Sequence, residues 1–278
     1  MDIAPYSGAL PGIMTTAALV PLTLIALRTI PQEKADAPWL FWLTLGVAIA
    51  GPAQWAFFQM SRGWSTGLAV ALTLTVAACL IAFAIVCAAS APAWRLSRLL
   101  LPYLLALSGL AAAAHANTLG HVLLGASPLW LDFHILISLT TYALVTLAAV
   151  AALAGVIQER ALKTKRPTWF SRALPAVAES ETLEIRLLAL SEAVLGAGLM
   201  SGMALLYHQT GAPLRFDHKT LLSIAAFLVI GTLLIARARS GVRGRAAARL
   251  ALSAYFLLTL AYIGVKFVRE VLLHTATL

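Results

Sequence analysis

Long apolar runs recur along this chain of 278 residues and are separated by polar stretches. An α-helix rises about 1.5 Å per residue, so about 20 mostly apolar residues are needed to cross a bilayer core about 30 Å thick. Eight runs meet that length, and each predicts a transmembrane helix. They cover residues 8–28, 38–58, 66–88, 98–116, 132–157, 186–207, 220–237 and 250–272.

The connections between these runs are short, with one exception. Residues 158–185 are rich in charge and contain Pro167, which predicts an aqueous loop. The sequence shows neither a soluble domain nor an internal repeat. We therefore expect one integrated membrane domain, with a four-helix region at residues 1–126 and a second four-helix region at residues 127–278.

The composition agrees with a membrane protein. Hydrophobic residues make up 61% of the chain and charged residues 11%, whereas soluble domains are about half apolar and about a quarter charged. The mean hydropathy is +0.89. The predicted fold class is an all-α, polytopic integral membrane protein with about eight transmembrane helices, surrounded by the lipid bilayer. In so apolar a chain the net charge of +9 fits cytoplasmic loops, and we expect no nucleic-acid partner.

The basic residues divide unequally between the two ends of the predicted helices. One set of ends carries fifteen of the 20 Lys and Arg residues. Because cytoplasmic loops are enriched in Lys and Arg, this set is expected to face the cytoplasm and both termini the periplasm. We predict a multi-pass membrane protein. The fifteen are Arg28, Lys34, Arg95, Arg98, Arg160, Lys163, Lys165, Arg166, Arg172, Arg186, Arg237, Arg239, Arg243, Arg245 and Arg249.

All six histidines fall on the opposite side of this map. Imidazole is a good axial ligand of haem iron, and two ligands on different helices can hold haem without covalent attachment. Covalent attachment is not expected, because Cys79 and Cys87 form no CxxCH motif. The six are His115, His121, His134, His208, His218 and His274.

His134 is the best placed of the six for a ligand role. It opens the fifth predicted helix, with Ser138, Thr141 and Tyr142 behind it on one side, and those hydroxyls can order the mouth of the helix. In the alternative interpretation, His134 only caps the membrane interface.

His274 ends a polar series spaced by four residues: Tyr262, Lys266, Glu270 and His274. Lys266 and Glu270 can pair, and Glu270 can accept a hydrogen bond from His274 and fix its tautomer. The alternative is a solvated helix end with snorkelling charges.

Glu192 is the one acid well inside a predicted span, about two turns from its cytoplasmic end. An acid at that place can serve as a proton relay or pair with a buried base, or it can be a hydrated structural residue. The same span carries Gly198 and Gly202 in a GxxxG pattern, which predicts close packing against another helix.

Sequence motifs of the common enzymes are absent. The chain has no Walker A loop, GxGxxG, HExxH or GxSxG motif, so nucleotide hydrolysis and the common hydrolase mechanisms are not expected.

Four stretches of the second half resemble one family. Residues 127–143 read Ser-Pro-Leu-Trp-Leu-Asp-Phe-His-Ile-Leu-Ile-Ser-Leu-Thr-Thr-Tyr-Ala. Phe-Asp-His-Lys-Thr follows at 216–220, Gly-Val-Arg-Gly-Arg at 241–245 and Tyr-Ile-Gly-Val-Lys-Phe at 262–267. In this order they resemble the CcsA/ResC-type cytochrome c assembly proteins, in which Trp-Leu precedes an external haem-ligand histidine. The first four predicted helices match that family only in being hydrophobic.

Two departures point to a particular branch. The synthases of this family carry a tryptophan-rich WWD segment, but this chain has no tryptophan after Trp169, and Leu234–Arg237 stands where a further histidine is expected. The chain is therefore most similar to the short YpjD/HemX-like inner-membrane branch. The resemblance implies haem b held non-covalently by His134 and His274 as axial ligands of the iron, with His218 as a weaker candidate.

Three functions follow from these observations. The first is a haem-handling protein that assists cytochrome c assembly by presenting haem to apocytochrome c or other maturation proteins, without bond-making catalysis. The second is a regulatory membrane protein that modulates haem biosynthesis through its basic 158–185 loop. The third is a metal-ion or haem transporter that uses Glu192 and the external histidines.

Overall fold

The fold is known from a computed structural model that describes residues 10–28, 37–62, 67–115, 129–211 and 217–268. Within these ranges the regular elements are all helical and no strand occurs, which confirms the predicted all-α class. The helices are α1 (Leu10–Arg28), α2 (Trp39–Arg62), α3 (Leu68–Ala89), η1 (Ala91–Leu96), α4 (Ser97–His115), α5 (Leu129–Lys163), α6 (Trp169–Arg172), α7 (Val177–Thr210), α8 (His218–Ser240), α9 (Gly244–Thr259), η2 (Leu260–Gly264) and α10 (Val265–Phe267).

Six helical segments of the described chain are long and apolar enough to cross a membrane. They are α3, η1 with α4, α5, α7, α8, and α9 with its continuation through η2 and α10. The prediction of a multi-pass membrane protein is therefore confirmed. Helices α1 and α2 also coincide with predicted spans, and the number of eight crossings stays a prediction.

The predicted long loop at residues 158–185 is mostly helical. Helix α5 continues to Lys163 and α7 begins at Val177, so only a short connection containing α6 remains. Hydropathy marks the part of a helix inside the membrane, whereas polar contacts extend it further. Lys163 pairs with Glu159 one turn earlier, and Glu179 accepts a hydrogen bond from the Ala176 N–H at 2.9 Å where α7 begins.

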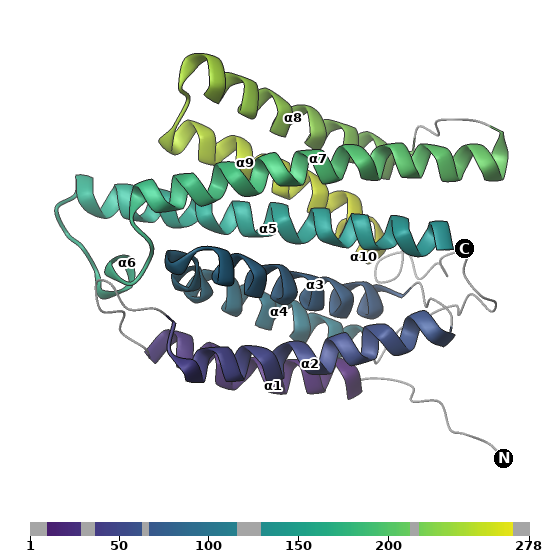
Figure 1. The fold of residues 1–278 in the computed structure, drawn as a ribbon, viewed down its shortest axis with the longest axis horizontal. Coiled ribbons are helices and arrows are strands. Elements are labelled where there is room, and N and C mark those ends of the chain that lie inside the picture. Colours follow the sequence, from purple (N-terminus) through teal and green to yellow (C-terminus); the bar gives the residue numbers. More distant parts are fainter. Residues whose placement is uncertain (1–9, 29–36, 63–66, 116–128, 212–216, 269–278) are drawn as a thin grey trace.

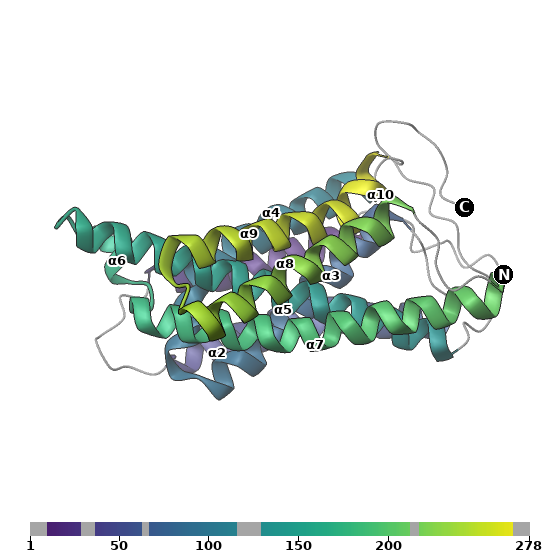
Figure 2. The same cartoon turned by 90° about the horizontal axis from the view of Figure 1, so that it is seen from above.

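The long helices run side by side, each antiparallel to the next along the chain (Figure 1). Helices α1 and α2 form one edge of the bundle, α3 and α4 lie beside them, and α5 and α7 cross the middle. Figure 2 shows α8 and α9 inclined to α7. We call the end where α5 finishes and α7 begins the basic end, and the opposite end the histidine end.

Helix α5 is the centre of the bundle. All residues from 141 to 152 are buried, and α5 contacts α7, α9 and α3. Small side chains such as Ala143, Ala148 and Ala151 allow neighbouring helices to approach it closely. At Gly155, an added Cβ would lie 3.5 Å from the Cβ of Ser180 on α7. Side chains on α5 are therefore held by several neighbours at once.

Candidate functional site

His134 lies half-buried in the second turn of α5, at the histidine end. Its Nδ1 lies 2.8 Å from the Oγ of Ser201 on α7, and that hydroxyl donates to the carbonyl of Gly198 at 2.9 Å. A serine hydroxyl carries one proton. With this proton directed to the Gly198 carbonyl, Nδ1 of His134 is the donor to Ser201, and the lone pair of the neutral ring lies on Nε2.

Helix α7 presents glycines where α5 packs against it. A Cβ added at Gly202 would lie 3.1 Å from Cε1 of His134, and one at Gly198 would lie 3.0 Å from Cγ2 of Ile137. Both distances are shorter than ordinary van der Waals contact, so larger residues would displace α5. The predicted GxxxG packing is thus present in the structure, and its partner is the helix that carries His134.

The hydroxyls predicted to order this helix mouth do not bond to the imidazole of His134. Ser138 donates to the His134 carbonyl at 2.8 Å, and Thr141 donates to the Ile137 carbonyl at 2.9 Å. The hydroxyl that holds the imidazole is Ser201, which sequence reasoning missed. Its signal was present inside the GxxxG stretch, but that stretch was interpreted only as packing.

His218 is brought to the same end of the bundle. It is the exposed first residue of α8, and the preceding Asp217 caps that helix by accepting a hydrogen bond from the Thr220 N–H at 2.8 Å. The next residue, Lys219, lies close enough to His134 to act on it electrostatically. The N-terminus of α8 therefore lies at the same end of the bundle as His134.

His274 and Glu270 lie outside the described residues, as does His121. The pairing of His134 with His274 therefore stays a prediction. Within the described residues, no group of three or more His, Cys, Asp and Glu side chains could hold a metal ion.

Four hydroxyls from α4, α5 and α9 form a hydrogen-bonded series that returns to the backbone carbonyl of its first member, Tyr255, and we call this series the hydroxyl ring. Tyr255 donates to the Tyr103 hydroxyl at 2.7 Å. The Tyr103 and Tyr142 hydroxyls lie 3.1 Å apart, and those of Tyr142 and Thr259 lie 3.2 Å apart. Thr259 then donates to the Tyr255 carbonyl at 2.8 Å. Followed in this direction every hydroxyl proton has an acceptor, as buried polar networks require.

The ring joins α5 to α9 near a break in the regularity of α9. Residues Leu260–Gly264 form a π-helical turn, and the ring of Tyr262 within it lies 5.8 Å from that of Tyr142. The Tyr262 side chain also lies near that of Thr75 on α3. A π-turn accommodates an extra residue and changes which face the following residues present, and such turns are frequent at functional sites. The Tyr-Ile-Gly-Val-Lys-Phe stretch at 262–267, which carries part of the family resemblance, begins within this turn.

Glu192 lies further from the start of its helix than the predicted span implied. It is 15 residues from the start of α7, which is about four turns rather than the expected two. A Cβ at Gly231 of α8 would lie 2.9 Å from its Oε1. Its Oε2 is buried and has no hydrogen-bond partner within the described part of the chain. An ionised carboxylate that is buried without a partner inside an apolar helix bundle is costly, and this favours the neutral carboxyl group.

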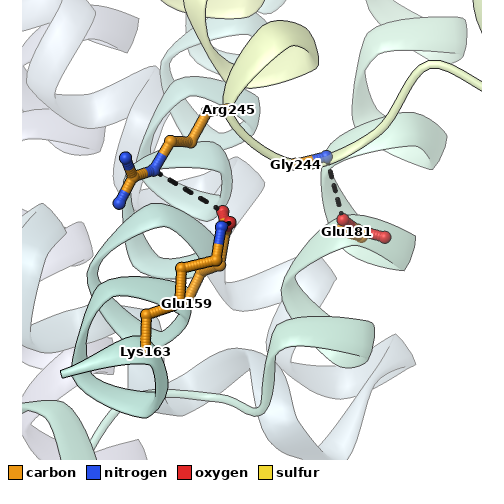
Figure 3. Close-up of polar contacts among 5 residues, drawn as sticks. All are labelled: Glu159, Lys163, Glu181, Gly244 and Arg245. Carbon is orange, nitrogen blue, oxygen red and sulfur yellow. Dashed lines mark hydrogen bonds and ion pairs between the residues drawn. The ribbon is translucent and has the colours of Figure 1, made fainter.

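At the basic end, two glutamates hold the turn between α8 and α9 (Figure 3). The N–H of Gly244 donates to Oε1 of Glu181 on α7 at 3.1 Å. Nε of Arg245 lies 4.0 Å from Oε2 of Glu159 on α5. The turn that contains the Gly-Val-Arg-Gly-Arg stretch therefore ties α8 and α9 to both central helices.

The two glycines of that turn are needed for its backbone. Gly241 has φ 64° and Gly244 has φ 62°, a left-handed conformation that glycine adopts without a steric cost. Gly241 also ends α8, where its N–H bonds to the Arg237 carbonyl at 3.1 Å.

Comparison with known proteins identifies the family. A family model described as "Cytochrome C assembly protein" matches residues 37–273. The chain belongs to the cytochrome c assembly protein family. A relative from Azospirillum brasilense, described as an uncharacterized 28.8 kDa protein in nifR3-like 5'region, is 55% identical over 257 residues, which cover 92% of this chain and 95% of that protein. No solved structure matches this chain.

The match gives this cytochrome c assembly protein a role in cytochrome c maturation and extends the resemblance seen in the sequence. That resemblance covered residues 127–278, whereas the family model begins at residue 37 and so includes α2, α3 and α4. The matched region contains His134, Ser201, the hydroxyl ring and the turn at 241–245. Tyr103 of α4 belongs to the matched region as well as to the ring.

Proposed function

We propose that this protein holds haem b non-covalently at the periplasmic face of the bacterial inner membrane and presents it for cytochrome c assembly. His134 and His274 are the proposed axial ligands, and His218 is a third candidate. Both termini face the periplasm, and apocytochrome c or another maturation protein receives the haem. The proposal places the chain in the YpjD/HemX-like branch, with binding and presentation in place of bond-making catalysis.

The observation that carries the proposal is the 2.8 Å hydrogen bond between Nδ1 of His134 and the Oγ of Ser201. Metal-binding histidines almost always donate their second ring N–H to a neighbouring acceptor, which fixes the tautomer and the orientation of the ring. With Nδ1 as the donor, the bond to Ser201 does both and leaves Nε2 of His134 with its lone pair. The ring is thus prepared as a ligand by residues of this chain.

The surroundings of His134 suit a flat, largely apolar, dianionic ligand. On the side where α7 packs, Gly202 presents no side chain to the His134 ring, and the polar α7 neighbour of the ring is Ser201, which contacts Nδ1. Lys219 supplies a positive charge nearby that suits a propionate carboxylate. When bound, haem supplies an iron centre with two axial positions for imidazole. The residues around it orient the ring, exclude water and balance charge.

The function is tested in cells by c-type cytochrome maturation. A strain that lacks this protein is complemented with wild type, His134→Ala, His274→Ala or His115→Ala, and covalent haem in c-type cytochromes is stained after electrophoresis. We expect His134→Ala and His274→Ala to lose most of the haem stain and His115→Ala to retain it. Full maturation by His134→Ala at equal protein level would contradict the proposed role.

A further inference from the structure

The segment that follows α5 is strongly basic. No Asp or Glu occurs between residues 160 and 178. Of its five exposed cations, Lys163 pairs with Glu159, and the structure shows no ion pair for the other four across this described stretch. Two large apolar side chains are exposed beside them. We call this set the basic surface: Arg160, Leu162, Lys163, Lys165, Arg166, Trp169 and Arg172.

The position of the basic surface along the membrane normal follows from α5. No charged residue occurs from Ile135 to Gln158, a helical length of about 36 Å against a bilayer core of about 30 Å. Residues beyond Gln158 therefore leave the apolar core at the depth of the lipid headgroups. This placement holds whichever side of the membrane the basic end faces.

The two apolar members of the surface fit that depth. Leu162 is 68% exposed and Trp169 is 69% exposed. Exposure of such large apolar side chains to water is unfavourable. Tryptophan is enriched at the boundary between lipid and water, where its ring contacts the acyl region and its N–H stays hydrated. An occupant of this surface must cover apolar groups and neutralise cations together.

The segment is also fixed to the bundle. Nη1 of Arg98 on α4 donates to the Ala173 carbonyl at 3.0 Å, and Nε2 of Gln158 donates to the Leu174 carbonyl at 3.1 Å. The Thr168 side chain caps α6 by accepting from the Ser171 N–H at 3.1 Å. The backbone that carries Trp169 and Arg172 is therefore fixed relative to the bundle, which lowers the entropy lost when a ligand binds.

We propose that the basic surface binds anionic phospholipid headgroups of the surrounding membrane. Arginine guanidinium groups bind phosphate oxygens through paired N–H donors, and each nearby cation adds to the attraction of an anionic bilayer surface. An acidic protein segment would meet the same charges, but the headgroup depth and the exposed Trp169 and Leu162 favour lipid. The surface lies at the end opposite to His134, so this proposal is independent of haem.

The test measures which lipid contacts Trp169. Full-length protein is reconstituted in vesicles that contain equal fractions of phosphatidylcholine and phosphatidylglycerol, with bromine on the acyl chains of one lipid or the other. The difference in fluorescence between wild type and Trp169→Phe isolates the quenching of Trp169. We expect brominated phosphatidylglycerol to quench Trp169 more strongly than brominated phosphatidylcholine.

Matched variants connect that preference to the basic surface. In the triple variant Arg160→Gln, Arg166→Gln, Arg172→Gln, the preference falls about fivefold for each charge removed at low salt. The control triple variant Arg239→Gln, Arg243→Gln, Arg249→Gln removes three other exposed arginines. We expect this control to retain the preference for phosphatidylglycerol. Equal quenching by both lipids, an equal loss in both triple variants, or displacement of the lipid by added poly-glutamate would each overturn the proposal.

Discussion

The Nδ1 of His134 and the Oγ of Ser201 lie 2.8 Å apart and join α5 to α7 at the histidine end of the bundle. When the Ser201 proton is directed to the Gly198 carbonyl, which lies 2.9 Å from its Oγ, the histidine is the donor. The orientation and the tautomer of the ring therefore depend on a residue of another helix. This dependence can be tested without changing the histidine itself.

Replacing Ser201 by alanine removes the acceptor of the ring proton. We expect Ser201→Ala to weaken haem binding about 10- to 100-fold, because loss of such a supporting hydrogen bond lets the ligand ring turn and change tautomer. Haem titration of the purified variant measures the effect. Ser253→Ala is the matched control, since this exposed serine bonds only within its own helix. Equal affinities of the two variants would refute the role of Ser201.

Gly202 tests the close contact between α7 and the imidazole. Gly202→Ala places a Cβ 3.1 Å from Cε1 of His134, which is expected to cost about 1–3 kcal/mol of unfolding free energy as overpacking, and to displace the ring and weaken haem binding. Gly46→Ala in α2 is the control, because nothing lies within 4 Å of the added Cβ there. Denaturant titration in mixed micelles measures both, and a harmless Gly202→Ala would contradict the packing described.

The hydroxyl ring predicts a graded series of stability losses. Tyr142→Phe removes the hydroxyl that bonds to both Tyr103 and Thr259, and its expected cost is about 1–3 kcal/mol of unfolding free energy. Tyr255→Phe removes a single donated bond and is expected to cost about 0.5–1.5 kcal/mol. Thr232→Val, at an exposed residue whose hydroxyl donates to the Leu228 carbonyl of its own helix, serves as the control in the same unfolding titration. The ring would be of no consequence if all three variants unfolded alike.

Substitution of Glu192 distinguishes the hypothesis of haem presentation from that of transport. Glutamine keeps the shape of the side chain and removes the group that ionises, so Glu192→Gln is expected to change haem binding and maturation by less than about twofold if the carboxyl is already neutral. If this protein instead moved a proton or metal ion past Glu192, flux into proteoliposomes would stop in the variant. Cytochrome maturation and flux, measured side by side, decide between the two.

The orientation of the bundle can be measured with single cysteines. Cys79 and Cys87 are buried, so a maleimide that cannot cross the membrane should report only on an introduced cysteine. We expect it to label His218→Cys, at the histidine end, in intact spheroplasts, and to label Arg243→Cys, at the basic end, only after the membrane is opened. The reverse pattern would show that the charge asymmetry had been assigned to the wrong side.

Hydropathy predicted where the helices lie because each membrane segment has to satisfy its backbone within a helix and present apolar side chains to lipid or to other helices. It did not predict where α5 and α7 end, because Glu159, Lys163 and Glu179 extend or begin these helices outside the membrane. The same error placed Glu192 too close to the end of α7.

Contacts between helices could not be predicted from the sequence, for a different reason. Tyr103 and Tyr255 are 152 positions apart, and Tyr142 and Thr259 are 117 apart. No periodicity connects residues at such separations. His134 was identified by its place at a helix mouth, whereas its partner Ser201 is 67 positions away. The π-turn at Leu260–Gly264 likewise has no pattern of its own in an apolar run.

The central claim is that His134 of this chain binds haem iron together with a second histidine. The most direct test is the absorption spectrum of the purified protein, supplied with haem, in oxidised and reduced form. The account predicts a Soret band and sharp reduced bands of a bis-imidazole haem in the wild type, with loss of this spectrum in His134→Ala. A wild type without a Soret band, or a His134→Ala variant with an unchanged spectrum, would contradict it.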